Sequence, residues 1–299
     1  MPWIQFVVRA EEKQAHRVED LFLTLGACSV TFTDAEDQPV LEPAPGETPI
    51  WAQTQVTGLF DAGVNTTQIT QALRSAYHKQ TGQELAQVNV EILEDKDWER
   101  EWMENFHPIR CGERLWICPS WREPPEPDAV NLLLDPGLAF GTGTHPTTFL
   151  CLEWLDKQTL HQHKVVDFGC GSGILAISAL LLGAESATGI DIDPQALLAS
   201  RENATRNNLD PDRLKLYLPT ELEPDNSVAG DIVIANILAQ PLLQLADQIS
   251  NMVKPGGKLA LSGIIANQAE QIIARYQSDF DLDPVREKDD WVLISGTRR

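Results

Sequence analysis

The 299-residue sequence predicts an α/β protein in which a small α+β domain precedes a larger domain built on a mostly parallel sheet. Residues 1–93 follow the order strand, helix, strand, strand, helix, strand. Residues 129–299 alternate strand-like apolar runs with helical patterns, which is typical of buried strands covered by helices on both faces. The intervening residues 94–128 are predicted to form a connecting helix and a proline-rich linker.

The first domain is predicted from alternating and helical periodicities. Val18, Leu21, Phe22 and Leu25 recur at helical spacing before Gly26. A second helix is expected from Asn65 or Thr66, as its cap, to Gly82. The predicted strands cover residues 3–10, 30–32, 51–60 and 85–93, with a short additional strand at 40–41. This βαββαβ order is that of a split-βαβ, ferredoxin-like domain.

The connector is marked by three aromatic residues. Trp98, Trp102 and Phe106 recur every four residues, so a helix would carry all three on one face. An apolar run follows at 115–118, and then the proline-rich segment 123–128. We expect the aromatic face to pack against a domain. Docking of a substrate on the acidic side chains of the other faces is the alternative role for this helix.

The second domain is predicted to contain a doubly wound sheet. Asp193 and Pro194 are typical of the cap and first residue of a helix. A turn is predicted at 254–257, and the last two strands are expected to form an antiparallel hairpin at one edge. The predicted strands cover residues 131–134, 165–168, 187–192, 214–218, 231–236, 259–262, 280–287 and 291–297. The predicted helices cover residues 147–155, 174–182, 194–207, 242–253 and 268–277.

The formal net charge of −21 limits the partners of the chain. Residues 1–128 hold 22 acidic and 10 basic side chains, and residues 129–299 hold 22 and 13. Both halves are therefore acidic, which disfavours direct binding to nucleic acid or to an anionic membrane. The charge favours a basic partner, although it could equally serve solubility alone.

The five cysteines and the N-terminal sequence point to a reducing compartment. The cysteines show no metal-ligand spacing, so we expect free thiols and no metal site. No signal peptide and no apolar span of about 18 residues is recognisable. A cytoplasmic protein, expected to be monomeric, is predicted.

A glycine-rich turn is the strongest functional signal. Asp167 ends an apolar run and is followed by Gly169, Gly171 and Gly173 at alternate positions, where bare backbone lets a ligand approach. This spacing differs from the G-x-G-x-x-G of pyrophosphate-binding turns, and together with the preceding acid Asp167 it suits a ligand with a cationic ammonium or sulfonium group. Asp191 lies 18 residues after Gly173, about where a ribose-binding carboxylate is needed. Helix capping is the alternative role for Asp191, but Asp193 suits that role better.

Together these motifs resemble those of the class I S-adenosylmethionine-dependent methyltransferases. The matching segments are DFGCGSG at 167–173, GID at 189–191 and KPGG at 254–257. Two further segments, DPGLAFGTGTHPTT at 135–148 and NILA at 236–239, resemble more specifically the family that methylates large-subunit ribosomal protein eleven. The resemblance extends over the whole chain.

That family resemblance implies a ferredoxin-like substrate-recognition domain joined to a Rossmann-like catalytic domain. It implies repeated methyl transfer from S-adenosylmethionine to lysine side chains and the N-terminal amine of ribosomal protein eleven. By position, Gly169 and Gly171 match the cofactor loop, Asp191 matches the ribose acid, and Thr148 matches a cofactor contact. Asn236 matches the residue beside the methyl donor, as both a catalytic and a cofactor-binding residue.

Chemistry agrees with a role for Asn236. Methyl transfer to an amine is an in-line displacement that needs positioning and desolvation more than a nucleophilic side chain. The amide oxygen of Asn236 can accept an N–H bond from the amine and direct its lone pair. The NILA segment lacks the prolines and tyrosine of the Asn-Pro-Pro-Tyr motif, so a less constrained pocket could admit one amine repeatedly. His145, and less so His107, are further candidates for a base or a cofactor contact.

Three alternatives remain open from the sequence. The acceptor could be another protein, an RNA or a small molecule, although the net charge opposes RNA and the extra domain opposes a small metabolite. A nicotinamide oxidoreductase is disfavoured by the missing G-x-G-x-x-G motif. A binding-only module is disfavoured by the presence of both Asp191 and Asn236.

Overall fold

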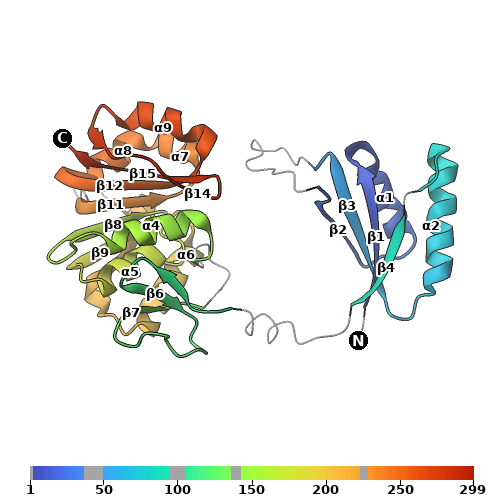
Figure 1. Ribbon diagram of the computed structural model, residues 1–299, viewed down its shortest axis with the longest axis horizontal. Coiled ribbons are helices and arrows are strands. Elements are labelled where there is room, and N and C mark those ends of the chain that lie inside the picture. The colour runs from blue at the N-terminus through green and yellow to red at the C-terminus, as the bar shows by residue number, and fades with distance from the viewer. Residues whose placement is uncertain (1–2, 37–49, 86, 94–105, 136–142, 223–227) are drawn as a thin grey trace. The chain divides into compact units, whose positions relative to one another are not determined.

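The computed structural model describes residues 3–36, 50–85, 87–93, 106–135, 143–222 and 228–299. The chain divides into two compact units, residues 1–103 and 104–299, and each is described by itself. Figure 1 shows the elements of both units along the chain. The short strand predicted at 40–41 and the connector residues Trp98 and Trp102 lie outside the described residues.

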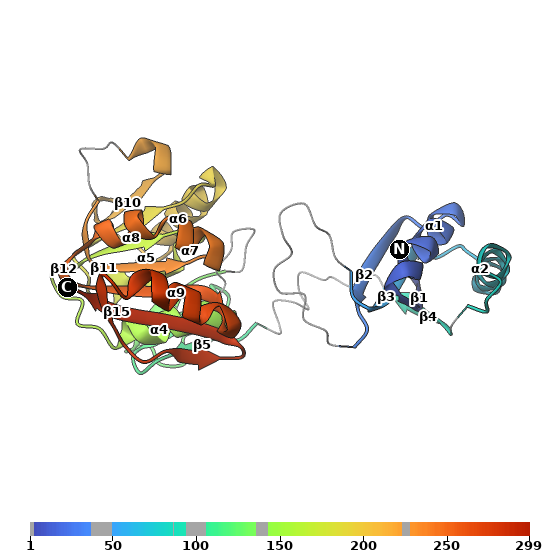
Figure 2. The same cartoon turned by 90° about the horizontal axis from the view of Figure 1, so that it is seen from above.

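The first unit has the predicted ferredoxin-like topology. Its elements are β1 (Trp3–Glu11), α1 (Glu12–Thr24), β2 (Ser29–Asp34), β3 (Gln53–Asp61), α2 (Thr66–Thr81) and β4 (Val88–Leu93). The strands form an antiparallel sheet in the order β2-β3-β1-β4. Both helices cover the same face of this sheet (Figure 2), where Phe6, Phe22 and Phe60 pack edge to face. Asn65 and Gly82 cap α2 as predicted.

The second unit contains the predicted, mostly parallel sheet. Its helices are α4 (Pro146–Asp156), α5 (Ile174–Leu181), α6 (Pro194–Arg206), α7 (Ala239–Gln244), α8 (Ala246–Met252) and α9 (Ala269–Tyr276), with 3-10 turns at Pro211–Arg213, Pro219–Glu221 and Ala266–Gln268. Its main strands are β8 (Lys164–Phe168), β9 (Ser186–Ile190), β10 (Leu214–Tyr217), β11 (Gly230–Asn236), β12 (Val253–Ile265), β13 (Phe280–Leu282), β14 (Arg286–Lys288) and β15 (Trp291–Arg298).

The order of these strands places the predicted motifs on neighbouring strands. The strand order of the sheet is β10-β9-β8-β11-β12-β15-β13, and β14 also pairs with β15. Strands β8 to β12 run parallel, and β15 is antiparallel to β12. The last strands do form a hairpin, but β15 lies inside the sheet, between β12 and β13. The turn predicted at 254–257 is part of β12, where a register shift against β11 accommodates it.

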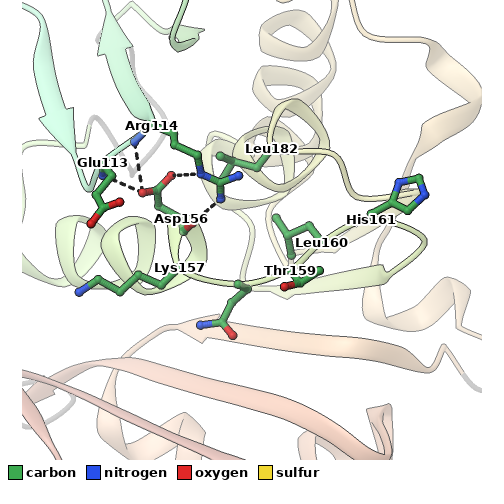
Figure 3. Close-up of a pocket in the computed structure, with 9 residues that line it drawn as sticks. Glu113, Arg114, Asp156, Lys157, Thr159, Leu160, His161 and Leu182 are labelled. Carbon is green, nitrogen blue, oxygen red and sulfur yellow. Dashed lines mark hydrogen bonds and ion pairs between the residues drawn. The ribbon is translucent and has the colours of Figure 1, made fainter.

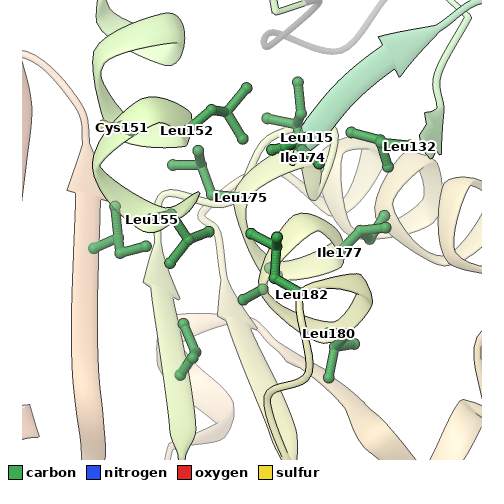
Figure 4. Packing of buried hydrophobic residues seen from close by; sticks show 14 of the residues in the cluster. Leu115, Leu132, Cys151, Leu152, Leu155, Ile174, Leu175, Ile177, Leu180 and Leu182 are labelled. Carbon is green, nitrogen blue, oxygen red and sulfur yellow. The ribbon is translucent and has the colours of Figure 1, made fainter. Parts of the chain in front are cut away.

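Alternating residues of the central strands fill two separate cores. Val165 and Ile234 lie in the core beneath α4 and α5, whereas Val166 and Val233 lie in the core beneath α7, α8 and α9. Figure 4 shows Leu152 and Leu155 of α4 packed near Leu175 of α5 in the first of these cores. Because both faces are covered, the central strands are largely apolar, as the sequence indicated, although β8 includes the buried Asp167.

A small additional sheet belongs to the second unit. It consists of β5 (Ile109–Cys111), β6 (Leu115–Cys118) and β7 (Val130–Leu133), with β5 antiparallel and β7 parallel to β6. Leu115, Ile117 and Leu132 are fully buried in the core beneath α4 and α5. The residues 109–118, which the sequence assigns to the connector, thus contribute to the core of this unit.

Three further properties bear on function. No helix among the described residues is long and apolar enough to cross a membrane. All five cysteines are free thiols, and four of them are buried. Within the described part of the chain, no group of three or more His, Cys, Asp or Glu side chains is arranged to hold a metal ion.

Candidate active site

The predicted site residues gather at the carboxyl ends of three adjacent strands. Phe168 of β8 pairs with Ile190 of β9 on one side and with Ala235 of β11 on the other. The glycine turn follows β8, Asp191 follows β9, and Asn236 ends β11. The topology therefore brings motifs that are far apart in sequence to one edge of the sheet, where ligands of open α/β sheets bind.

The glycine turn is held in place by backbone and side-chain hydrogen bonds. Gly169, Gly171 and Gly173 all have positive φ, between 54° and 79°. The Gly169 amide donates to the carbonyl of Ile190 at 2.7 Å. Ser200 Oγ and Asn203 Nδ2, both on α6, donate to the carbonyls of Gly171 and Ser172 at 2.9 Å each. The turn is thus fixed by hydrogen bonds within the protein.

Asp193 has the helix-capping role that the sequence predicted for it, and Asp191 lies beside the glycine turn. The Asp193 carboxylate accepts from the Gln195 amide at 2.9 Å and caps α6. Asp191 instead accepts from the Gly171 amide at 2.9 Å and from the Asp193 amide at 3.0 Å. Asp191 therefore braces the glycine turn and presents a carboxylate beside it. The adjacent Ile192 is 85% exposed.

The side chain of Asp167 does not have the orientation expected of a ligand-binding residue. It is fully buried, and its Oδ2 accepts from the Ala176 amide in the first turn of α5 at 3.0 Å. Its Oδ1 has no hydrogen-bond partner among the described residues. Burial raises the pKa of Asp167 to about 7, and the neighbouring Asp191 carboxylate adds to this. The sequence suggested that this acid suits a cationic ligand, whereas here it caps a helix beneath the turn.

Thr148 and Asn236, which lie 88 residues apart, meet at the end of β11. Asn236 Nδ2 donates to the Thr148 hydroxyl at 3.3 Å. This bond fixes the amide so that its oxygen points away from Thr148. Asn236 Oδ1 is buried and has no partner among the described residues. A buried, unpaired amide oxygen is costly, which makes this atom a candidate ligand-binding group.

The two candidate histidines have different environments. His145 caps α4, with Nδ1 2.8 Å from the Thr147 hydroxyl, and its ring lies edge-on to Trp291 at 4.8 Å. Burial lowers the pKa of His145, which favours the neutral ring. His107 is exposed. His145 thus has a structural role at the start of the helix that carries Thr148.

Some residues of the site were not identified from the sequence. Ser200 and Asn203 are spaced three apart on α6, but nothing in the sequence distinguishes them from other polar helix residues. Ile237 contacts Gly169, and the only sequence signal for it was its place in the NILA segment.

A cavity of about 520 Å³ lies elsewhere in the second unit. Its lining includes Arg114 and Asp156, which form an ion pair at 3.2 Å, together with His161 (Figure 3). The residues 159–161 of its lining precede β8, whereas the glycine turn follows it. The cavity is therefore at the opposite edge of the sheet from the predicted site.

The fold and the site together define a Rossmann-like, class I methyltransferase domain. Comparison with known proteins makes the assignment narrower. The sequence model of the family described as "Ribosomal protein L11 methyltransferase (PrmA)" matches residues 2–299. The chain belongs to this family.

Individual relatives match the chain over its full length. Proteins named ribosomal protein L11 methyltransferase from Marinobacter nauticus and Pseudomonas aeruginosa are 54% and 57% identical to the chain over all 299 residues, which cover 99% of each relative. A crystal structure of a ribosomal protein L11 methylase from Lactobacillus delbrueckii subsp. bulgaricus is 34% identical, with a TM-score of 0.58. That match covers 65% of this chain and 100% of the solved chain.

Proposed function

We propose that this enzyme transfers methyl groups from S-adenosylmethionine to ribosomal protein L11, at lysine side chains and the N-terminal amine. Membership of the family and the names of its relatives support this substrate. The observation that carries the chemistry is the buried, unpaired Oδ1 of Asn236 beside the glycine turn.

The residues at the ends of β8 and β9 fit S-adenosylmethionine. The glycine turn offers bare backbone, and Asp191 offers a carboxylate that can accept hydrogen bonds from both ribose hydroxyls in addition to the amides it already holds. The exposed Ile192 is an apolar surface next to that carboxylate and suits the adenine ring. When bound, the cofactor supplies an electrophilic methyl group on a sulfonium centre. We assign Gly169, Gly171, Asp191, Thr148 and Asn236 to its binding.

Asn236 is assigned to the acceptor amine. Its Nδ2 is occupied by Thr148, so the free oxygen is the atom that can accept an N–H bond. Accepting this bond orients the amine so that its lone pair is directed at the methyl group. Asn236 therefore acts by positioning and requires no change of its own protonation state.

Deprotonation of the lysine ammonium follows from its surroundings. A lysine in water has a pKa of about 10.4. Entry into a site with little water favours the neutral amine, so the ammonium releases its proton to the solvent as the side chain enters. An uncharged acceptor such as Asn236 Oδ1 does not stabilise the ammonium as a carboxylate would. A strong general base is therefore unnecessary, and the neutral His145 at the start of α4 is not needed in that role.

Repeated methylation is consistent with the sequence after Asn236. The segment Ile237, Leu238, Ala239 contains no proline and no aromatic ring, and Leu238 is 53% exposed. A pocket without a rigid aromatic wall leaves room for an amine that already carries one or two methyl groups.

The remaining assignments concern the partner and its recognition. We assign substrate recognition to residues 1–93 and catalysis to residues 129–299, joined by residues 94–128. The net charge of −21 favours a basic protein as substrate and disfavours direct nucleic-acid contact. We further propose that the enzyme is a cytoplasmic monomer.

Mass spectrometry of ribosomal proteins from cells that lack this chain tests the proposal. We expect methyl groups to be lost from L11 alone and to be restored by the wild-type chain but not by Asn236→Ala. Unchanged masses of L11 in the deletion cells would refute the proposed substrate. Loss of methyl groups from a different protein would identify another acceptor.

A further inference from the structure

Ile237 lies between two glycines that come from different parts of the chain. It follows Asn236 directly and is only partly buried. Its side chain contacts Gly169 in the cofactor turn, and its backbone contacts Gly263 in β12. Both glycines have positive φ, 79° and 82°.

Gly263 lies in a bulge of β12 next to the end of β11. The pairing of β12 with β15 shifts between Leu261 and Ile264, so β12 carries one extra residue there. The preceding residue, Ser262, is paired with Asn236 in the parallel register, and its hydroxyl donates to the Val292 carbonyl at 2.8 Å. The bulge is thus anchored to β15 on one side and to the strand end that carries Asn236 on the other.

The absence of a side chain at Gly263 is required by this packing. A Cβ at this position would lie 2.7 Å from the carbonyl carbon of Ile237 and would overlap with its oxygen. Because the obstructing atoms are backbone atoms, no side-chain rotation relieves the overlap. An alanine there would displace the peptide that follows Asn236.

The side chain of Ile237 packs against Gly169. A Cβ on Gly169 would overlap with Ile237 Cγ2, and the remaining Ile237 atoms stay at ordinary distances. The methyl branch at Cβ of Ile237 therefore rests on the bare backbone of the cofactor turn. A displacement of Ile237 would therefore change the contact between its side chain and Gly169.

We propose that Ile237 is a positioning residue that couples the acceptor amide to the cofactor turn, and that the Gly263 bulge sets its position. The inference rests on the proposed roles of Asn236 and of the glycine turn. It predicts that a change in β12 weakens cofactor binding and slows methyl transfer, although Gly263 belongs to neither motif.

Two glycine variants separate this coupling from backbone strain. Gly256, also in β12, has φ of 74° and nothing within 4 Å of the position that a Cβ would occupy, so Gly256→Ala introduces the strain without the collision. We expect Gly263→Ala to weaken S-adenosylmethionine binding about tenfold and to lower kcat about a hundredfold. Gly256→Ala should leave both values near those of the wild type. Equal cofactor affinities for the two folded variants would overturn the proposal.

A pair of substitutions at Ile237 gives an independent test if Gly263→Ala does not fold. Ile237→Val keeps the Cγ2 methyl that rests on Gly169, whereas Ile237→Leu removes this branch with no loss of carbon atoms. We expect cofactor affinity near the wild-type value for Ile237→Val and about tenfold weaker binding for Ile237→Leu. Similar affinities for the two would overturn the proposal.

Calorimetric affinity is the primary readout because it does not depend on the acceptor. If the wild type binds S-adenosylmethionine but leaves ribosomal protein L11 unmodified, the proposed substrate fails. The glycine and isoleucine pairs would still decide whether Ile237 positions the cofactor turn.

Discussion

The glycine turn and the end of β11 differ in how their polar groups are paired. Asp167 Oδ1, buried beneath the turn, also has no partner among the described residues, but the backbone of the turn itself is paired. At the ends of β8 and β9, the amides of Gly169 and Gly171 and the carbonyls of Gly171 and Ser172 all have partners within the protein. At the end of β11, Asn236 Oδ1 has none among the described residues. In the proposed function, the first half of the site is preorganised to receive the cofactor, whereas the second half is completed by the acceptor amine.

This difference matches two different tasks. A cofactor that binds in one fixed pose benefits from a rigid surface, because little ordering remains to be done on binding. An acceptor that changes with each methyl transfer needs a single directional bond in a dry environment. Changes in the first half should therefore affect affinity and stability, and changes in the second half should affect turnover.

The largest effect is expected for Asn236→Ala. Loss of the free amide oxygen removes the bond that directs the amine, so kcat should fall by about 10²–10³-fold. Steady-state kinetics with ribosomal protein L11 measures this. Asn236→Asp should also lose turnover, because its carboxylate stabilises the ammonium form of the amine and cannot donate to Thr148. An Asn236→Ala enzyme with full turnover would remove Asn236 from the reaction.

Asp191→Ala should weaken cofactor affinity by about 10²-fold. The carboxylate is proposed to bind the ribose, and it also holds the Gly171 amide, so two charge-assisted interactions are lost together. Asp193→Ala is the control, because this residue caps α6 without a bond to the turn. Calorimetry should find affinity reduced only in the Asp191 variant; equal losses in both variants would mean that the acid pair acts only through α6.

Asp167 beneath the turn predicts a dependence of stability on pH. Its pKa is about 7 in the folded protein, well above the usual value of 3.8, so the folded state holds a proton that the unfolded chain releases. Stability from this group is therefore greatest at low pH and is lost as pH rises through 7. Between pH 5 and pH 8 the loss is about 2–3 kcal/mol.

The variant Asp167→Asn removes this titration. Its free energy of unfolding should fall less than that of the wild type between pH 5 and pH 8, as measured by urea denaturation of both proteins at each pH. An identical pH dependence in the two proteins would show that Asp167 does not titrate in this range.

The smallest effect is expected for Ser200→Ala. Its hydroxyl donates one neutral hydrogen bond to Gly171, which contributes about 1 kcal/mol. Thermal unfolding should show a lower midpoint, with cofactor affinity changed by a few-fold at most. A loss of affinity as large as that of Asp191→Ala would mean that the turn depends on α6 more than on Asp191.

The elements of the fold were largely predictable because their signals are local. Asn65 and Gly82 mark the ends of α2, Asp193 and Pro194 mark the start of α6, and the apolar runs mark β8 and β11. The strand at 131–134 and the apolar run at 115–118 were recognised, but their pairing with β5 in a separate three-stranded sheet was not predicted, because these strands have only three or four residues and lie beside a proline-rich segment. The position of β15 inside the sheet depends on pairing that no local pattern specifies.

The site was predictable in composition but not in geometry. Asp191 was predicted from its place after a strand, and Asn236 from the family resemblance of the segment at 236–239. The bond between Thr148 and Asn236, the direction of Asp167 and the contacts of Ile237 are long-range packing outcomes. Sequence spacing carries no information on such contacts, since they arise from segments that the topology brings together.

The division between the two halves is tested most directly by the affinity of S-adenosylmethionine for Asn236→Ala, measured by calorimetry beside Asp191→Ala. We expect the Asn236 variant to bind the cofactor within about tenfold of the wild-type affinity, and the Asp191 variant to lose about a hundredfold. A loss of affinity in Asn236→Ala as large as that in Asp191→Ala would contradict the assignment of Asn236 to the acceptor.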